Sequence, residues 1–314
     1  MKRNTHVYIV HKAIEFMRDS VDNLLANTST NSEVRKASKV SKAKRGSLKT
    51  KAKKLQRLMY AHRDSIIEAA WASDALIHDK RRFHTFKLFK DGIFDAQEAK
   101  AFRKQTYRDI YHRGSDSGGA PYKVDHIAAV ISDFRKLREY NDNFSTREIQ
   151  YLYILASHYI VDLHVPMHCD LRDDPPAQEN ILGKPGPLTA YFNKSLHGTV
   201  EDRWEKAVTP LAVESGYIDI ETHKECSKRT EYSCAVEFDL EEMSHRALIR
   251  PVYLDDTGIM DFMIDRGICS FERSLEIWPP SEPEYSSRKV TKEITRKIFA
   301  EAISSVISVW LAID

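Results

Sequence analysis

The sequence has few of the residues that build β-rich, disulfide-stabilised or membrane-spanning proteins. It contains 4 cysteines, 11 glycines and 11 prolines in 314 residues. Four scattered cysteines do not make a disulfide framework in a chain of this length, and so little glycine and proline is unusual for an all-β protein. No apolar run approaches the length of a membrane span or a signal-peptide core. We therefore expect a cytoplasmic protein without a transmembrane segment.

Acidic residues are absent between Val34 and Arg63, a stretch that holds twelve lysines and arginines. The whole chain has a formal charge of +2, so the remainder has 36 basic and 46 acidic residues, a balance of −10. We expect residues 28–55 to form a basic loop or arm, either solvated or in contact with a polyanion through Arg35–Arg57. Few aromatic residues stand among these charges, which argues against stacking on nucleic-acid bases.

Apolar residues recur at three- and four-residue spacing and strand-like alternation is scarce, so the predicted fold class is all-α. A hydrophobic content of 42% supports a substantial core. No repeat or domain boundary is evident, and we expect one multi-helix domain over residues 1–314, with C-terminal helices of unknown role in 206–314. The spacing predicts helices near 5–26, 55–77, 95–112, 122–141, 146–165, 190–208, 236–249, 256–276 and 287–312. The proline-rich stretch 170–189 should form a loop, and 78–95 should be irregular.

Two short segments, ASHYIVDLHVPMH and SLHGTVEDRWE, concentrate histidines and carboxylates. His158 and Asp162 are four residues apart, as are His197 and Glu201, so each pair shares one face of a helix. His168 comes just after a proline that should end the first helix. Imidazole nitrogens and carboxylate oxygens are typical zinc ligands. One such pair would often be a surface salt link, but two pairs with a third histidine indicate a metal site.

This His-x-x-x-Asp…Pro-x-His segment, followed by a His-x-x-x-Glu pair, resembles two related groups of enzymes. They are the bacterial zinc-dependent phospholipases C and the single-strand-specific nucleases of fungi and plants. The likeness covers roughly residues 1–205 and includes THVYIVHKAIEFM, AAWASD and RRFHTF, which place further ligands at His6, Asp74 and His84. The resemblance implies an all-α hydrolase of phosphate diesters with up to three zinc ions, its metal site built from residues 1–205.

The resemblance also implies how the ligands are shared and what they do. The expected groups are Asp74, His84 and His158, with Asp162 bridging or nearby; His168, His197 and Glu201; and His6 and Asp162, completed by the chain's own N-terminus at Met1. Family members use the amine and carbonyl of a processed N-terminal residue there, and Met1 should be retained because Lys2 is large. Zinc lowers the pKa of a bound water to near neutrality, so that it can attack the phosphate diester. Asp74 would be the catalytic residue that orients or deprotonates this water.

The substrate is phospholipid or nucleic acid by this resemblance. In the nucleases an aromatic residue that stacks on a base directly follows the histidine matched by His84, whereas Thr85 stands here. Ile77 likewise replaces an arginine, and a glutamate at position 201 is the phospholipase-like choice. We therefore expect a phospholipase C-like enzyme. The alternatives are a single-strand nuclease and a non-catalytic helical metal-binding protein whose basic arm docks on nucleic acid or an anionic membrane.

Overall fold

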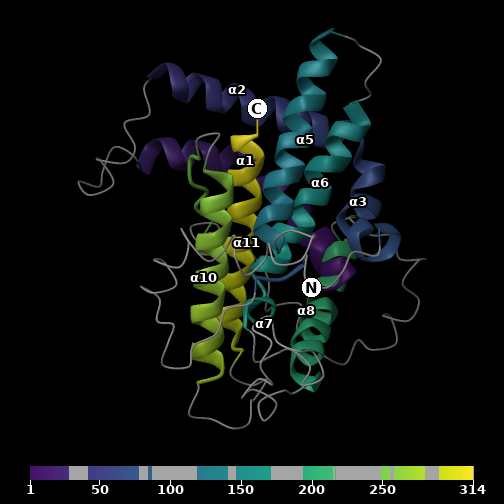
Figure 1. The fold of residues 1–314 in the computed structure, drawn as a ribbon, viewed down its shortest axis with the longest axis vertical. Helices are drawn as coiled ribbons and strands as arrows, with labels where there is room; N and C mark the ends of the chain where they lie inside the picture. Colours follow the sequence, from purple (N-terminus) through teal and green to yellow (C-terminus); the bar gives the residue numbers. More distant parts are fainter. Residues whose placement is uncertain are drawn as a thin grey trace, which may run out of the picture.

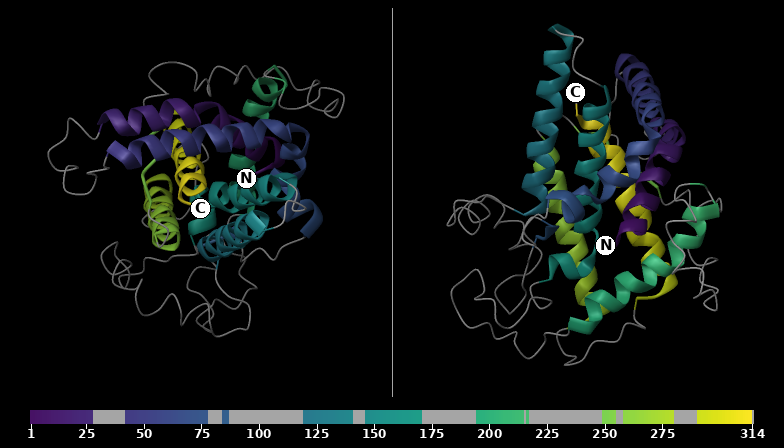
Figure 2. Two further views of the ribbon diagram at one scale, coloured as in Figure 1. Left: turned by 90° about the horizontal axis from the view of Figure 1, so that it is seen from above. Right: turned by 90° about the vertical axis from the view of Figure 1, so that its right-hand side faces the viewer.

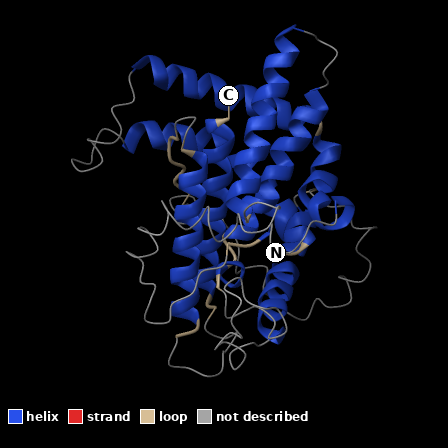
Figure 3. Ribbon diagram, viewed as in Figure 1, coloured by secondary structure: helices blue, strands red, loops and turns tan. Residues whose placement is uncertain are grey.

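Every regular element among the described residues is helical, and none of those residues forms a strand (Figure 3). The computed structural model describes residues 1–27, 42–77, 84–86, 119–140, 146–170, 194–214, 216, 249–254, 258–279 and 290–313. The elements in chain order are α1 (Arg3–Asn27), α2 (Lys42–Ala61), the short turn η2 (Arg63–Ser65), α3 (Ile66–Ala72), the π-helical turn η3 (Ser73–Ile77), α5 (Ala120–Tyr140), α6 (Thr146–Leu163), α7 (Pro166–Cys169), α8 (Lys194–Glu214), α10 (Ile259–Ile277) and α11 (Lys292–Ala312). The predicted all-α class is confirmed. No described helix is both long and apolar enough to cross a membrane.

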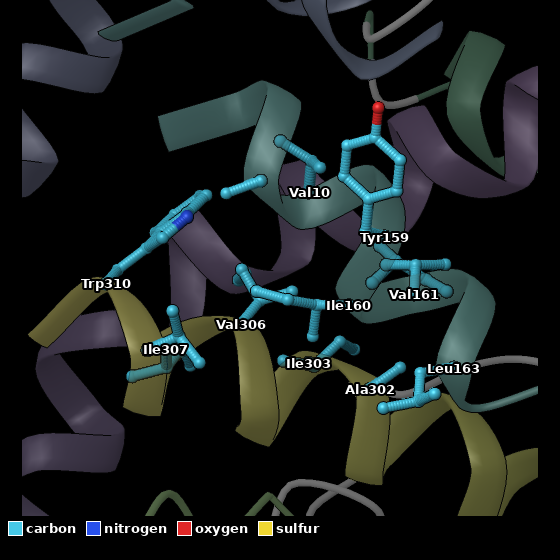
Figure 4. Close-up of a cluster of buried hydrophobic side chains, with 14 of the residues drawn as sticks. Val10, Tyr159, Ile160, Val161, Leu163, Ala302, Ile303, Val306, Ile307 and Trp310 are labelled. Carbon is cyan, nitrogen blue, oxygen red and sulfur yellow. The ribbon is translucent and has the colours of Figure 1, made fainter. Parts of the chain in front are cut away.

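Helix α6 lies in the middle of the bundle and packs against α5, α3, α11 and α1 (Figures 1 and 2). Its C-terminal half is buried on all sides, so the apolar residues there point both to α1 and to α11. Figure 4 shows Ile160 and Leu163 of α6 beside Ala302 and Ile303 of α11. Burying an aliphatic side chain of this size stabilises a fold by about 1.5–3 kcal/mol. This packing fixes the position of the helix that carries the first histidine–aspartate pair.

The ends of these helices follow from capping and from hydrogen bonds to neighbouring helices. The N-cap residue Thr291 accepts a hydrogen bond from the Ile294 amide (3.2 Å), which satisfies one of the amides left over at the start of α11. Helix α6 ends just before Pro166, as predicted, because a proline there cannot continue its hydrogen-bonding pattern. The indole of Trp310 donates to the Tyr153 carbonyl (3.0 Å) and fastens α11 to α6.

Two predictions about α2 and its surroundings were wrong. The expected loop or arm at 28–55 is helical from Lys42 onward, whereas residues 28–41 lie outside the described part. Leu48, Ala52, Leu55 and Met59 form a buried stripe at helical spacing within the run of charges. That stripe lets α2 pack against α1. The helix expected at 55–77 is also broken, since α2 ends at Ala61 and α3 begins afresh at Ile66.

The other predicted helices are present wherever they are described, with the largest differences at α8, which ends at Glu214 rather than 208, and at α11, which begins at Lys292 rather than 287. The segment 95–112 and all but the last residue of 236–249 lie outside the described residues. The same holds for the irregular segment 78–95 apart from 84–86, and for the loop 170–189 apart from Asp170. The division into domains stays a prediction.

Candidate metal centre

Six segments bring titratable side chains together around the Met1 amine. Helix α6 supplies His158 and Asp162, one turn apart and both buried, and α7 adds His168 just beyond the break in the chain. The remaining contributors are the start of α1, η3, residues 84–86 and α8. The i, i+4 pairs and the histidine after the proline predicted the contributions of α6, α7 and α8, and the family resemblance predicted those of the other three segments.

Asp162 stands at the centre, and its two carboxylate oxygens face different neighbours. Its Oδ2 lies 2.8 Å from His84 Nδ1 and 3.2 Å from His158 Nε2. Its Oδ1 lies 2.7 Å from the Met1 amine and 3.3 Å from His6 Nε2. The side chain of Asp162 is only 3% exposed. His168 Nδ1 is 3.7 Å from the same Oδ1, so a single buried carboxylate lies within 4 Å of four imidazoles and an ammonium group.

Three groups of side chains have ligand atoms close enough to hold a metal ion. Within each group these atoms lie within 4.8 Å of one another. The groups are His6, His158 and Asp162; Asp74, His84 and His158; and His168, His197 and Glu201. The last two match the sets expected from the sequence. The first contains the expected His6 and Asp162 and also His158, which therefore belongs to two groups.

The amine of Met1 lies between two of these groups. It is 2.7 Å from Asp162 Oδ1 and 2.9 Å from Glu201 Oε1, and it is fully buried. Burial alone would lower the pKa of this amine, but the two carboxylates outweigh it and raise the pKa to about 11. The ammonium thus balances negative charge that would otherwise be costly to bury.

Backbone carbonyls set the orientation of two of the imidazoles. Nδ1 of His158 donates to the Ala70 carbonyl (2.9 Å), and Nδ1 of His168 donates to the His84 carbonyl (3.0 Å). Because a carbonyl only accepts, each ring carries its proton on Nδ1 and directs the lone pair of Nε2 into the cluster. His168 Nε2 then lies 3.0 Å from His197 Nε2, which in turn lies 2.9 Å from Glu201 Oε1, so three possible ligand atoms meet at one point.

The protonation states of His6, His168, Asp162 and Glu201 are those of metal ligands. Burial lowers the pKa of His6 to about 3 and that of His168 to about 4, so both rings are neutral at pH 7. Burial would raise the pKa of Asp162, but the Met1 amine and His158 outweigh it and lower that pKa well below its ordinary value. The same amine lowers the pKa of Glu201 against the effect of its burial. Metal binding requires neutral imidazole and ionised carboxylate.

His6 supplies the test of whether the residues fit a metal. Its ring is fully buried and stacks on the ring of His158 with centroids 4.1 Å apart. Neither of its nitrogens forms a hydrogen bond within the described part of the chain. A buried polar atom without such a bond costs about 1–3 kcal/mol. Coordination of a cation by Nε2, which points toward Asp162, would remove this cost at one nitrogen.

Asp74 lies at the edge of the cluster. Its carboxylate is 3.7 Å from His84 Nε2 and 3.8 Å from His158 Nε2, and 35% of its side chain is exposed. Burial raises the pKa of Asp74, an effect that the neighbouring His158 partly offsets. Asp74 is thus the most exposed of the three carboxylates in these groups.

Glu205 is a positioning residue that the motifs did not identify. Its two carboxylate oxygens accept hydrogen bonds from the backbone amides of Asn4 and Thr5, each at 2.9 Å. A carboxylate at the first turn of a helix satisfies open amides and interacts favourably with the helix dipole. Glu205 follows Glu201 by four residues on α8, so one helix face both enters the cluster and anchors the start of α1.

No protein-family model, curated protein or solved structure matches this chain. The all-α fold and three candidate metal groups therefore stand on the geometry alone.

Proposed function

We propose that this protein is a zinc-dependent phosphodiester hydrolase of the phospholipase C type, with the corresponding all-α fold. The observation that carries the proposal is the convergence of three ligand groups on the buried carboxylate of Asp162. A donor set of imidazoles and carboxylates without a thiolate is typical of catalytic rather than structural zinc. Several cations gathered at one buried site suit a substrate whose reaction concentrates negative charge, as phosphate diester hydrolysis does.

The residues proposed to hold zinc are those already placed in the cluster. They are Asp74, His84 and His158 for one ion; His168, His197 and Glu201 for a second; and His6, Asp162 and the Met1 amine for a third. Zinc bound there would supply charge for the phosphoryl oxygens and increase the acidity of water. The lone pairs directed inward by the Ala70 and His84 carbonyls and the neutral state of His6 support this assignment.

Asp74 is the proposed catalytic residue. Its partial exposure lets it reach a water that arrives from solvent, whereas Asp162 is enclosed by its partners. The carboxylate would orient that water and accept its proton as the phosphate diester is attacked. The raised pKa of Asp74 brings it closer to the range in which a carboxylate is an effective base.

The side chains beside Asp74 favour a lipid over a nucleic acid. Leu76 and Ile77 complete the η3 turn and are 58% and 50% exposed. Exposed apolar side chains near a site are suited to an apolar ligand or a lipid surface. A nuclease would instead be expected to present aromatic stacking and basic groups there.

The test is hydrolysis by the full chain after chelation and after reloading with zinc. The substrates are bis(p-nitrophenyl) phosphate, a short-chain phosphatidylcholine and single-stranded DNA. We expect zinc to restore cleavage of the first two, and His168→Ala to reduce it at least roughly a hundredfold. The matched control His126→Ala removes an exposed histidine of α5 and should leave turnover unchanged.

The outcomes separate the three candidate functions. Preference for DNA over phosphatidylcholine would assign the site to the nuclease alternative. Stoichiometric zinc without hydrolysis of any of the three substrates would assign it to a non-catalytic metal-binding protein. Full activity of the chelated protein would remove the proposed role of zinc.

A further inference from the structure

A second concave site lies near the opposite end of α6 from the metal centre. An open cavity of about 570 Å³ is lined by α2, α5 and α6, all of which meet at the top of Figure 1. Helix α6 lines it with Thr146, Ile149 and Tyr153. Tyr153 precedes Asp162 by nine residues, about 14 Å along a helix axis. The cavity is therefore distinct from the metal centre, and its ligand is independent of the function proposed for that centre.

The walls of the cavity combine cationic groups with an apolar floor. Five of the eleven lining residues are basic, and none is acidic: Lys51, Lys54, Arg57, Arg135 and Arg138. The floor is made by buried side chains, among them Leu55, Ile149 and Tyr153. Like charges gathered around a low-dielectric space repel one another, and an anion placed among them removes this repulsion.

One arginine is held in place by the floor itself. Arg135 Nη1 donates to the Tyr153 hydroxyl (3.0 Å) and to the Ile313 carbonyl (3.3 Å). Arg57 and Arg138 form no ion pair within the described part of the chain. Arg57 is exposed and Arg138 half-buried, and both line the cavity, so their guanidinium groups are available for a ligand. Guanidinium groups bind carboxylate and phosphate through two parallel hydrogen bonds.

We propose that this cavity binds a small amphipathic anion, a single apolar chain that ends in a carboxylate or a phosphate. The volume lies within the range of small-molecule sites, about 300–1,000 Å³. The buried floor would receive the chain, and the cationic mouth would receive the head group. A nucleic-acid backbone would use the charges but would leave the apolar floor unfilled.

Calorimetric titration of the zinc-loaded full chain tests this proposal. The ligands are decanoate, decyl phosphate, 1-decanol and inorganic phosphate, each below its micellar concentration where it has one. Decanoate and decyl phosphate should bind, and the tighter of the two identifies a fatty acid or a phosphorylated lipid as the source. Decanol and inorganic phosphate should each bind at least about tenfold more weakly, because decanol lacks the anionic head group and inorganic phosphate lacks the apolar chain.

Matched variants locate the binding. The double variant Arg57→Gln and Arg138→Gln should weaken decanoate binding at least about tenfold, since hydrogen bonds to charged groups contribute about 1.5–3 kcal/mol each. Lys53→Gln with Lys136→Gln removes the same charge from exposed positions of the same two helices outside the lining, and should leave affinity unchanged. Ala61→Trp, on the exposed rim, should block the cavity, with circular dichroism confirming the fold.

Three results would overturn the proposal. They are equal binding of decanol and decanoate, equal loss in the cavity and control double variants, and tight binding of single-stranded DNA with none of decanoate. The last result would indicate that the basic residues of α2 contact a polyanion instead.

Discussion

Asp74 and Asp162 carry the same side chain but have different surroundings, and this difference divides their roles. Asp162 is enclosed by imidazoles and the Met1 amine, whereas Asp74 is about one-third exposed. Asp74→Asn keeps the shape and removes the charge, so we expect turnover to fall at least roughly a hundredfold. The control Asp64→Asn changes an exposed carboxylate that pairs with Arg147 at the surface. Unchanged turnover with full zinc content would mean that another carboxylate acts as the base.

Met1 gives a second prediction at the scale of one residue. Its ammonium lies between Asp162 and Glu201, and a peptide bond to a preceding residue would remove the positive charge. We expect an uncleaved N-terminal tag to lower the free energy of unfolding and to remove one zinc ion relative to the untagged chain. Atomic absorption and urea unfolding measure the two effects. Equal zinc content and equal activity with and without the tag would exclude the amine as a ligand.

At the scale of the element, α1 and α8 are joined by Glu205. Glu205→Ala would leave the amides of Asn4 and Thr5 without their acceptor, at a cost of about 1–3 kcal/mol. Because His6 lies in the same first turn of α1, we expect zinc to be lost from its group before the group containing Asp74. The control Lys206→Ala changes the neighbouring exposed residue of α8. Unaltered zinc content together with lowered stability would limit Glu205 to a structural role.

Periodicity predicted most described helices because their buried stripes are regular, but it did not predict where the 55–77 segment breaks. No glycine or proline marks that break. The His62 carbonyl instead accepts hydrogen bonds from the Ser65 hydroxyl and from the Gln150 amide of α6. Contacts such as the one to Gln150 join residues far apart in sequence, so no local pattern reveals them. The helical start of α2 was missed for another reason, since its charges obscured an apolar stripe that was present.

The candidate site was more accessible to sequence reasoning than the fold around it. The i, i+4 pairs of α6 and α8 identified four of its residues, and the family resemblance placed Met1, His6, Asp74 and His84 upstream. The sequence did not reveal the geometry of the site. It did not show that Asp162 faces both the Met1 amine and His84, or that the Ala70 carbonyl orients His158. Glu205 was not predicted, although it follows Glu201 by four residues, which is the same i, i+4 spacing as in the histidine–carboxylate pairs.

At the scale of the whole molecule, metal binding and folding should be coupled. The ligands come from six segments of the chain, and unfolding separates them, so zinc binds the folded state in preference. Zinc at 1,000 times its Kd would stabilise the fold by about 4 kcal/mol, which for a chain of 314 residues corresponds to a rise in Tm of roughly 6 °C. Calorimetry of the chelated and reloaded protein measures this shift. Magnesium, which prefers all-oxygen ligands, should produce none, and equal Tm values with and without zinc would contradict the coupling.

Anomalous diffraction at the zinc edge, from crystals grown with zinc, tests the metal centre most directly. We expect ions at the three groups around Asp162, with bonds of about 2.0–2.2 Å to nitrogen and oxygen. The peaks should lie among Asp74, His84 and His158; among His168, His197 and Glu201; and beside His6 and Asp162. A cluster without zinc in such crystals, with the Met1 ammonium alone balancing Asp162 and Glu201, would contradict the proposed metal centre.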